Sequence, residues 1–242
     1  MIDPAAAPGQ TDRHLRDLQG GYGAPMTLVE SILAGDRAAA VAALGAEPDS
    51  AAAVDDAGVS ALLLARYRGL DEVVDAIREL RPLDLPEAAS VGDIRRVGEL
   101  LAAGVSPDAP SPDGFSPVQL ALFFDQPAAA AVLIRAGADL DAAATHPMGI
   151  AAVHAAAASP TGAGLALAVA AGADLDAAQS GGFTPLHEAA HRGDAAMTEL
   201  LLAAGADPAR RTDDGRTPAD VARDDGHAEL ADRLDVSVTG PG

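Results

Sequence analysis

The chain has 242 residues, with 36 acidic and 16 basic side chains for a net charge of -20, and it contains no cysteine. The lack of cysteine excludes disulfides, thiolate nucleophiles and cysteine-ligated zinc, and the negative charge disfavours direct binding to DNA or RNA, whose phosphates it repels. Because 49% of the residues are apolar and only 2% are aromatic, the core is expected to consist of alanine, leucine and valine on closely spaced helices.

Residues 1–24 are predicted to form a flexible N-terminal tail or cap. They contain prolines and run into the glycine-rich stretch 20–25, a composition typical of loosely ordered segments. An alternative is a helix over Asp12–Leu18 that shields the first repeat. Charged residues occupy the place of an apolar signal region in Met1–Gly20, so the sequence predicts a cytoplasmic protein.

The first two predicted helical units are weak copies of those that follow. Leu28–Asp36 indicates a degenerate first unit, and Ser60–Leu80 indicates a second pair of helices. The next glycine in phase, Gly92, lies only 23 residues after Gly69. The connection around Arg81–Asp84 is therefore expected to be tight, with a change in the curvature of the stack.

Glycines recur at a period of 33 residues, and Gly149, Gly182 and Gly215 share one phase of it. Glycine at a fixed phase marks backbone positions that need a positive φ angle or lack space for a Cβ atom, so one small structural unit is repeated. The same phase runs through residues 142–173, which lack charged side chains. We therefore expect this stretch to be the buried middle of the stack and not a membrane span.

The unit 182–215 shows the pattern most clearly. Thr184 is a good N-cap residue and Pro185 suits the first helical turn, so a short helix is predicted to begin there and to end at Gly193. A second helix follows on apolar i, i+3, i+4 spacing until Gly205. The Asp- and Gly-rich residues after it predict a hairpin finger that leads into the next helix.

Two motifs of this unit resemble the ankyrin repeat. Thr184–Ala190 reproduces its T-P-L-H-x-A-A block, and Leu201–Asp207 reproduces its L-L-x-x-G-A-D block. The resemblance covers residues 83–235 and implies an all-α repeat solenoid over 25–236. It further implies helix-turn-helix units with short β-hairpin or loop fingers, about seven helical pairs in all, and a C-terminal tail at 237–242.

His187, Glu188 and His191 form the string H-E-x-x-H, a pattern that holds zinc in metalloproteases. In the aligned unit His154 remains, but alanines replace the glutamate and the second histidine, and a third ligand in suitable spacing is missing. The resemblance implies instead that the histidine bridges threonine and backbone groups between repeats. Nucleophile-elbow, phosphate-loop and dinucleotide-binding patterns are also missing from the sequence. We therefore predict no enzymatic activity, no metal and no cofactor.

The resemblance implies that recognition uses a concave surface made by the fingers and the ends of the first helices. Five of the six aromatic residues fall at these register positions, and aromatic and arginine side chains are common anchors of protein interfaces. The alternative is that these aromatics pack between neighbouring fingers, with Phe124 pointing into the stack. The predicted partner-binding residues are Tyr67, Arg68, Phe115, Phe123, Ile150, Phe183, His191, Arg192 and Arg216.

These features predict a non-enzymatic protein–protein interaction module that is monomeric and has no membrane contact. The net charge of -20 favours a basic protein partner. An alternative function is an acidic inhibitor or immunity-type protein that blocks a nucleic-acid-binding enzyme by charge mimicry, and simple solubilisation also explains the acidity. All basic residues are arginine, and lysine and asparagine do not occur; this composition predicts a GC-rich, bacterial genome.

Overall fold

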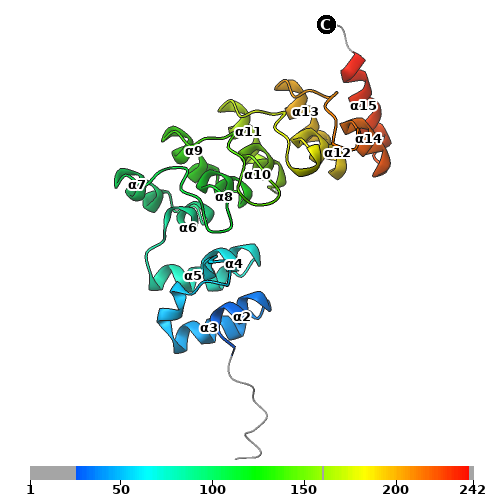
Figure 1. Ribbon diagram of the computed structural model, residues 1–242. Helices are drawn as coiled ribbons and strands as arrows, with labels where there is room; N and C mark the ends of the chain where they lie inside the picture. The colour runs from blue at the N-terminus through cyan, green and yellow to red at the C-terminus, as the bar shows by residue number, and fades with distance from the viewer. Residues whose placement is uncertain (1–25, 160, 240–242) are drawn as a thin grey trace, which may run out of the picture.

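The computed structural model describes residues 26–159 and 161–239 (Figure 1). Across these residues it contains fourteen α-helices, two short 3₁₀ helices and no β-strand. The helices stack side by side into one elongated, curved array that runs from α2 (Leu28–Leu33) to α15 (Ala228–Thr239). The fold is therefore an all-α solenoid, as predicted. The predicted N-terminal tail at 1–24, with the alternative helix at Asp12–Leu18, lies outside the described residues.

Helices alternate between two layers of the array. The first helix of each unit packs against the helix that follows it in the chain and against the first helix of the next unit. The first layer consists of α2, α4 (Ala61–Tyr67), α6 (Leu85–Ser90), α8 (Pro117–Phe123), α10 (Ala152–Ala158), α12 (Pro185–Arg192) and α14 (Pro218–Asp224). The second layer consists of α3 (Arg37–Ala46), α5 (Asp71–Leu80), α7 (Ile94–Ala102), α9 (Pro127–Arg135), α11 (Ala163–Ala170), α13 (Ala195–Ala203) and α15. The 3₁₀ helices are η1 (Pro48–Ala52) and η2 (Ser180–Gly182).

The predicted start and stop signals set the ends of the helices. Thr184 is the N-cap of α12 with Pro185 in its first turn, and Gly193 ends the helix with a φ of 65°. Gly205 follows α13 with a φ of 99°. Because left-handed backbone conformations are strained for residues with a Cβ atom, these glycines allow the chain to reverse after each short helix.

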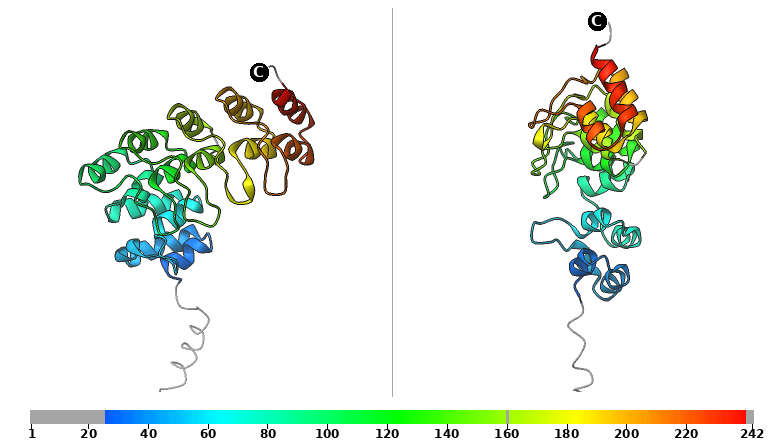
Figure 2. Two further views of the ribbon diagram at one scale, coloured as in Figure 1. Left: turned by 45° about the horizontal axis from the view of Figure 1, so that its top comes forward. Right: turned by 90° about the vertical axis from the view of Figure 1, so that its right-hand side faces the viewer.

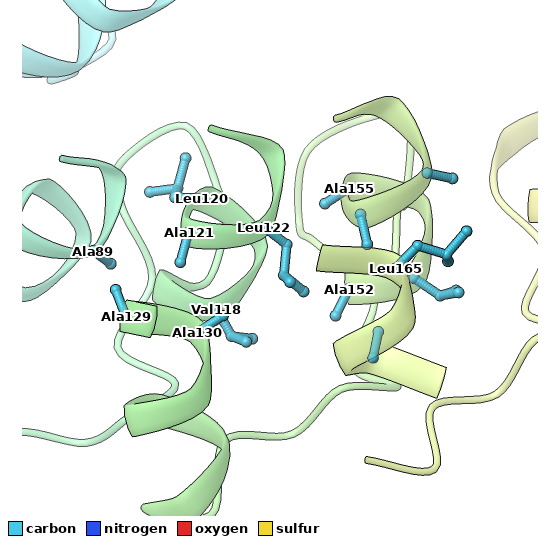
Figure 3. Close-up of a cluster of buried hydrophobic side chains, with 14 of the residues drawn as sticks. Ala89, Val118, Leu120, Ala121, Leu122, Ala129, Ala130, Ala152, Ala155 and Leu165 are labelled. Carbon is cyan, nitrogen blue, oxygen red and sulfur yellow. The ribbon is translucent and has the colours of Figure 1, made fainter. Parts of the chain in front are cut away.

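Small aliphatic side chains fill the space between the layers. Figure 3 shows this core around α8 to α11, where Leu122 and Leu165 lie among alanines of the neighbouring helices. Ala121, Ala129 and Ala152 are fully buried. Alanine lets short helices approach closely, so the low aromatic content of the chain agrees with the tight stacking of its helices.

The fingers between units are loops within the described residues. All of them project to the same side of the helix stack (Figure 2). Backbone hydrogen bonds close each finger, as from Ser111 N–H to the Phe115 carbonyl at 2.9 Å, and the only β-type pairing described there is one bridge between Val54 and Ser60. The described fingers therefore have the loop form and contain no ladder of paired residues; backbone hydrogen bonds instead join neighbouring fingers, as from Thr145 N–H to the Gly114 carbonyl at 3.0 Å.

The chain lacks a finger between α5 and α6. Residues 81–84 connect the two helices directly, and Figure 1 shows the stack changing direction at this point.

At the C-terminal end of the array, α15 extends to Thr239, beyond the boundary predicted at residue 236, and residues 240–242 lie outside the described part. The charge-free stretch 142–173 forms α10, α11 and their loops in the middle of the array. In the part of the chain that the structure describes, none of the helices has the length and apolar character needed to span a membrane.

Candidate functional site

An apolar pocket of about 280 Å³ opens between the first-layer helices and the finger loops of the central units. It brings together four of the nine predicted partner-binding residues, which are Tyr67, Phe115, Phe123 and Ile150. The complete set of lining residues is Tyr67, Phe115, Gln119, Leu120, Phe123, Met148, Ile150, His154, Ala155, Ala158, Gln179 and Glu188.

Most of the lining residues occupy equivalent positions in the units of α4, α8, α10 and α12. One group ends the first helix of its unit, a second follows the finger glycine, and a third stands four residues after the N-cap. Because the units stack in register, these three rows of side chains lie side by side along the array. The rows are Tyr67, Phe123 and Ala158; Phe115 and Ile150; and Leu120, Ala155 and Glu188.

An aromatic cluster forms the N-terminal wall of the pocket. Tyr67 contacts Phe123 edge-on with 6.5 Å between ring centroids, and it lies 5.4 Å from the ring of Phe124. The guanidinium carbon of Arg66 lies over the Phe124 ring, 4.5 Å from its centroid. Phe124 is half-buried and packs against the core, so for this residue the predicted alternative of an inward orientation is correct.

The phenol of Tyr67 is fixed by a hydrogen bond. Its hydroxyl group donates to Oδ2 of Asp113, in the following finger, at 2.7 Å. Burial and then this carboxylate raise the pKa of Tyr67 well above its usual value. The ring therefore stays neutral at physiological pH and serves as a fixed apolar wall.

Finger residues form the opposite wall. The Phe115 ring stacks on the imidazole of His146 with 4.9 Å between centroids. The carbonyl of Ile150 accepts a hydrogen bond from the side-chain amide of Gln119 at 3.0 Å. Met148 completes this wall and is 49% exposed. These contacts fix the positions of Phe115 and Ile150 in the pocket wall, whereas Met148 remains open to solvent.

The polar lining residues differ in how they are satisfied. Gln119 binds backbone groups through both its oxygen and its nitrogen. The Nδ1 atom of His154 accepts from the N–H of Ala151, and its Nε2 atom donates to the Phe183 carbonyl at 3.3 Å. Burial lowers the pKa of His154, so this imidazole is neutral near pH 7. Glu188 is the charged residue of the lining, and its half-buried carboxylate has neither an ion pair nor a hydrogen bond among the described residues.

Phe183 and Arg216 lie outside the pocket and contact each other. The guanidinium carbon of Arg216 is 5.8 Å from the centroid of the Phe183 ring. Asp214 accepts a hydrogen bond from Arg216 Nε at 2.8 Å, and Asp224 lies 3.6 Å from its Nη1. Both predicted residues therefore belong to a local cluster at the next finger.

The other three predicted residues are not brought together with the pocket. His191 lies 2.8 Å from Oδ2 of Asp225, and Arg192 donates from Nη1 to the carbonyl of Ala157 at 2.8 Å. Arg68 is the exposed C-cap of α4. These side chains stand along the same row of helix ends but do not line the cavity.

The H-E-x-x-H string does not converge on one point. His187 is buried; its Nδ1 atom accepts from the N–H of Thr184 at 3.2 Å, and its Nε2 atom donates to the Arg216 carbonyl at 3.1 Å. Both nitrogens are thus used in the bridge between repeats that the resemblance implies. Glu188 lines the pocket and His191 pairs with Asp225 instead. Among the described residues, no group of three or more His, Asp or Glu side chains is arranged to hold a metal ion.

Sequence reasoning missed Met148 and Glu188 as pocket residues. Glu188 could have been found by following the fourth position after each N-cap, because Leu120 and Ala155 stand at that position in the preceding units. Met148 lies inside a finger whose path is not encoded in the helix pattern, so no sequence signal marked it.

The comparison with protein families agrees with this geometry. Residues 169–222 match the family model for ankyrin repeats, which occur in many copies. Residues 169–222 therefore carry ankyrin repeats, and these repeats generally act as non-enzymatic modules of protein–protein interaction. No curated protein shows significant similarity to the chain.

Proposed function

We propose that this chain holds a protein partner on its concave face, with the apolar pocket as the anchor point. One observation carries the proposal: three large apolar side chains that are 38–49% exposed, those of Tyr67, Phe123 and Met148, gather around one cavity. Isolated exposed apolar residues are normal on a soluble protein, whereas a group around a pocket marks an interaction site. Aromatic side chains in such a pocket are typical anchors of binding energy.

The proposal includes the arrangement of the repeats. Seven helical pairs with loop fingers would form the solenoid over residues 25–236, and the fingers and first-layer helix ends would face the partner. Phe183, His191, Arg192 and Arg216 would extend the contact surface beyond the pocket toward the C-terminus. The charge of -20 would steer a basic partner to a monomer of this chain.

The test compares partner capture by three proteins. The wild type and the variants Phe123→Ala and Leu80→Ala are immobilised and exposed to native lysate, and bound proteins are quantified by mass spectrometry. Leu80 is a matched control, because it is a large exposed apolar residue on a second-layer helix away from the pocket. We expect Phe123→Ala to lose the specifically captured protein while Leu80→Ala retains it, with equal helical content in all three. Equal capture by both variants contradicts the proposal.

Charge mimicry is a second candidate function, which the unpaired acidic residues of the fingers favour. Asp55, Asp56, Asp113 and Asp213 form no ion pair among the described residues. Ionic strength separates the two functions, because exposed charges are screened by salt whereas apolar anchoring is not. Binding that depends on Phe123 and weakens little with salt supports the anchor, and binding that is lost steeply with salt but tolerates Phe123→Ala supports mimicry.

A further inference from the structure

The pocket carries one carboxylate at a position where five of the six other units have an apolar side chain and the first has Ser31. Glu188 stands fourth after the N-cap of α12, and the same position holds Leu64, Leu120, Ala155 and Val221 in other units. The fold therefore does not need a charge there. A half-buried carboxylate without a partner is costly to desolvate further, unless a cation compensates it.

The free polar groups of the pocket lie on its C-terminal side. Gln119, His154 and Tyr67 use their polar atoms in hydrogen bonds to the protein. The side chains of Gln179 and Glu188 have no such bonds among the described residues, and both line the cavity. An occupant therefore meets apolar and aromatic walls at one end, and the amide of Gln179 and the carboxylate of Glu188 at the other.

The pocket has room for a large apolar side chain of a partner. Its volume of about 280 Å³ is near the lower end of the roughly 300–1,000 Å³ of cavities for drug-sized small molecules. A large apolar side chain occupies much of this volume while the rest of the partner lies across the open concave face. The negative charge of Glu188, and of Asp113 beside Tyr67, is complementary to a basic neighbour of that side chain.

We infer that the pocket recognises a protein segment in which a large apolar side chain stands next to an arginine or lysine, with Glu188 pairing with the cation. This inference rests on the proposed function and names the chemistry of the partner. The apolar side chain supplies affinity, and Glu188 determines specificity for basic segments over neutral or acidic ones.

Blocked dipeptides test the inference directly. The probes are N-acetyl-Leu-Arg-amide, its citrulline analogue, which has nearly the same shape as arginine but no charge, and N-acetyl-Ala-Arg-amide. Methionine methyl groups labelled with ¹³C report the site by NMR, because Met148 lines the pocket whereas Met26 and Met197 do not. We expect the Leu-Arg probe to shift the Met148 signal at about threefold to tenfold lower concentration than either other probe.

Three variants separate the local carboxylate from the overall charge. Glu188→Gln removes the charge, and Glu188→Leu installs the residue that the unit of α8 already has at this position. Glu79→Gln removes an exposed charge from the second-layer helix α5. We expect both Glu188 variants to bind the arginine and citrulline probes within about twofold of each other, whereas Glu79→Gln keeps the preference for arginine.

Each contrary result identifies what fails. If wild-type protein binds the citrulline probe as tightly as the arginine probe, the cation inference is overturned, and the proposed anchor remains. If the Ala-Arg and Leu-Arg probes bind equally, recognition of a large apolar side chain is overturned. If uncharged 2-phenylethanol binds more tightly than every dipeptide, the pocket is a small-molecule site and the inference is also overturned. If no probe shifts the Met148 signal at about 20 mM while Phe123→Ala still loses partner capture, only this inference is wrong. If no probe shifts the signal and Phe123→Ala retains partner capture, the proposed function is contradicted as well.

Discussion

Gln119 donates a hydrogen bond from its side-chain Nε2 to the carbonyl of Ile150 at 3.0 Å, and so ties helix α8 to the pocket wall of the next unit. The same nitrogen donates to the carbonyl of Ala142 at 2.9 Å, and the side-chain oxygen accepts from the N–H of Ser116. His154 and His187 stand at the equivalent position and bridge to the next finger in the same way. In these three units, a polar side chain at this position therefore connects the first-layer helix to the finger that follows it.

Replacing Gln119 tests this bridge. Gln119→Ala removes the side-chain partner of three partly buried backbone hydrogen bonds, those of Ser116, Ala142 and Ile150, and we expect the free energy of unfolding to fall by about 2–3 kcal/mol. Gln119→His is the matched control, because the chain itself uses histidine at this position in two other units; we expect it to lose about 1 kcal/mol. Urea denaturation followed by circular dichroism measures both values. Equal losses for alanine and histidine would show that the bridge does not stabilise the fold.

The histidine bridges predict a dependence of stability on pH. Burial lowers the pKa of His154 and of His187 from the ordinary value of 6.5. Between the folded-state pKa and 6.5 the unfolded chain binds protons that the folded chain does not, so the free energy of unfolding rises with pH in this window. The stabilisation is complete above the ordinary pKa and is lost as the pH falls through the folded-state value.

Urea midpoints at about pH 7.5 and about pH 5.5 measure this effect. Each histidine contributes at most about 1.4 kcal/mol for each pH unit in the window. The double variant His154→Gln, His187→Gln uses the residue found at position 119 and keeps the bridges without a titrating group. We expect its stability to vary less over this range than that of the wild type. An unchanged slope contradicts the role of the two histidines.

The sequence predicts the helices well because their signals are local. Thr184, Pro185 and Gly193 act within a single unit, and the glycine phase transfers these boundaries to the other units. The same register places Tyr67 and Phe123 on one row of helix ends, and in the structure their ring centroids lie 6.5 Å apart across an intervening unit.

What the sequence does not predict depends on contacts between units. The nine predicted residues share register positions, but the pocket forms only at the centre of the array, where the walls of several units meet. Arg216 is directed away from the pocket by Asp214 and Asp224, an interaction that no pattern of spacing reveals. The loop form of the fingers likewise follows from hydrogen bonds between loops that are far apart in the sequence.

Two finger glycines of the same phase have different surroundings. Gly182 has a φ of 76°, and a Cβ atom added there would lie 2.7 Å from the backbone nitrogen of Asp213 in the next finger. Gly215 has a φ of 88° but open space around it. The N–H of Asp213 donates to the Gly181 carbonyl at 2.9 Å, so an alanine at 182 would also disturb the bond that joins the two fingers.

Alanine substitutions separate backbone strain from this close contact. Gly215→Ala adds only the strain of a left-handed residue, and we expect it to lower the free energy of unfolding by about 1 kcal/mol. Gly182→Ala adds displacement of the neighbouring finger, and we expect a loss of about 2–4 kcal/mol. Both are measured by urea denaturation. Similar losses would mean that the fingers separate without cost and that their contact does not stabilise the array.

Arg81 and Glu87 connect the second and third units where the finger is missing. Arg81 Nη1 donates to Oε2 of Glu87 at 2.8 Å, its Nη2 donates to the second carboxylate oxygen, and its Nε donates to the carbonyl of Ala51 at 2.7 Å. Glu87 is 1% exposed. Burial alone would raise the pKa of Glu87, but hydrogen bonds from Arg81 and Ser60 together lower it below the ordinary value, so the carboxylate is charged at neutral pH.

Breaking this pair is expected to destabilise the junction more than replacing it. Arg81→Met leaves a buried carboxylate without its cation and should lower the free energy of unfolding by about 3 kcal/mol. Arg81→Met combined with Glu87→Gln removes both charges, and glutamine already serves at the equivalent position 119; we expect the double variant to recover most of the loss. Because the folded-state pKa of Glu87 is lowered, the stabilisation in the wild type is present above 4.5 and is lost as the pH falls through the folded-state value. Urea denaturation at neutral pH measures the stability of both variants. If the double variant is no more stable than Arg81→Met, the loss does not come from an unpaired buried carboxylate, and the ion pair itself holds the two units together.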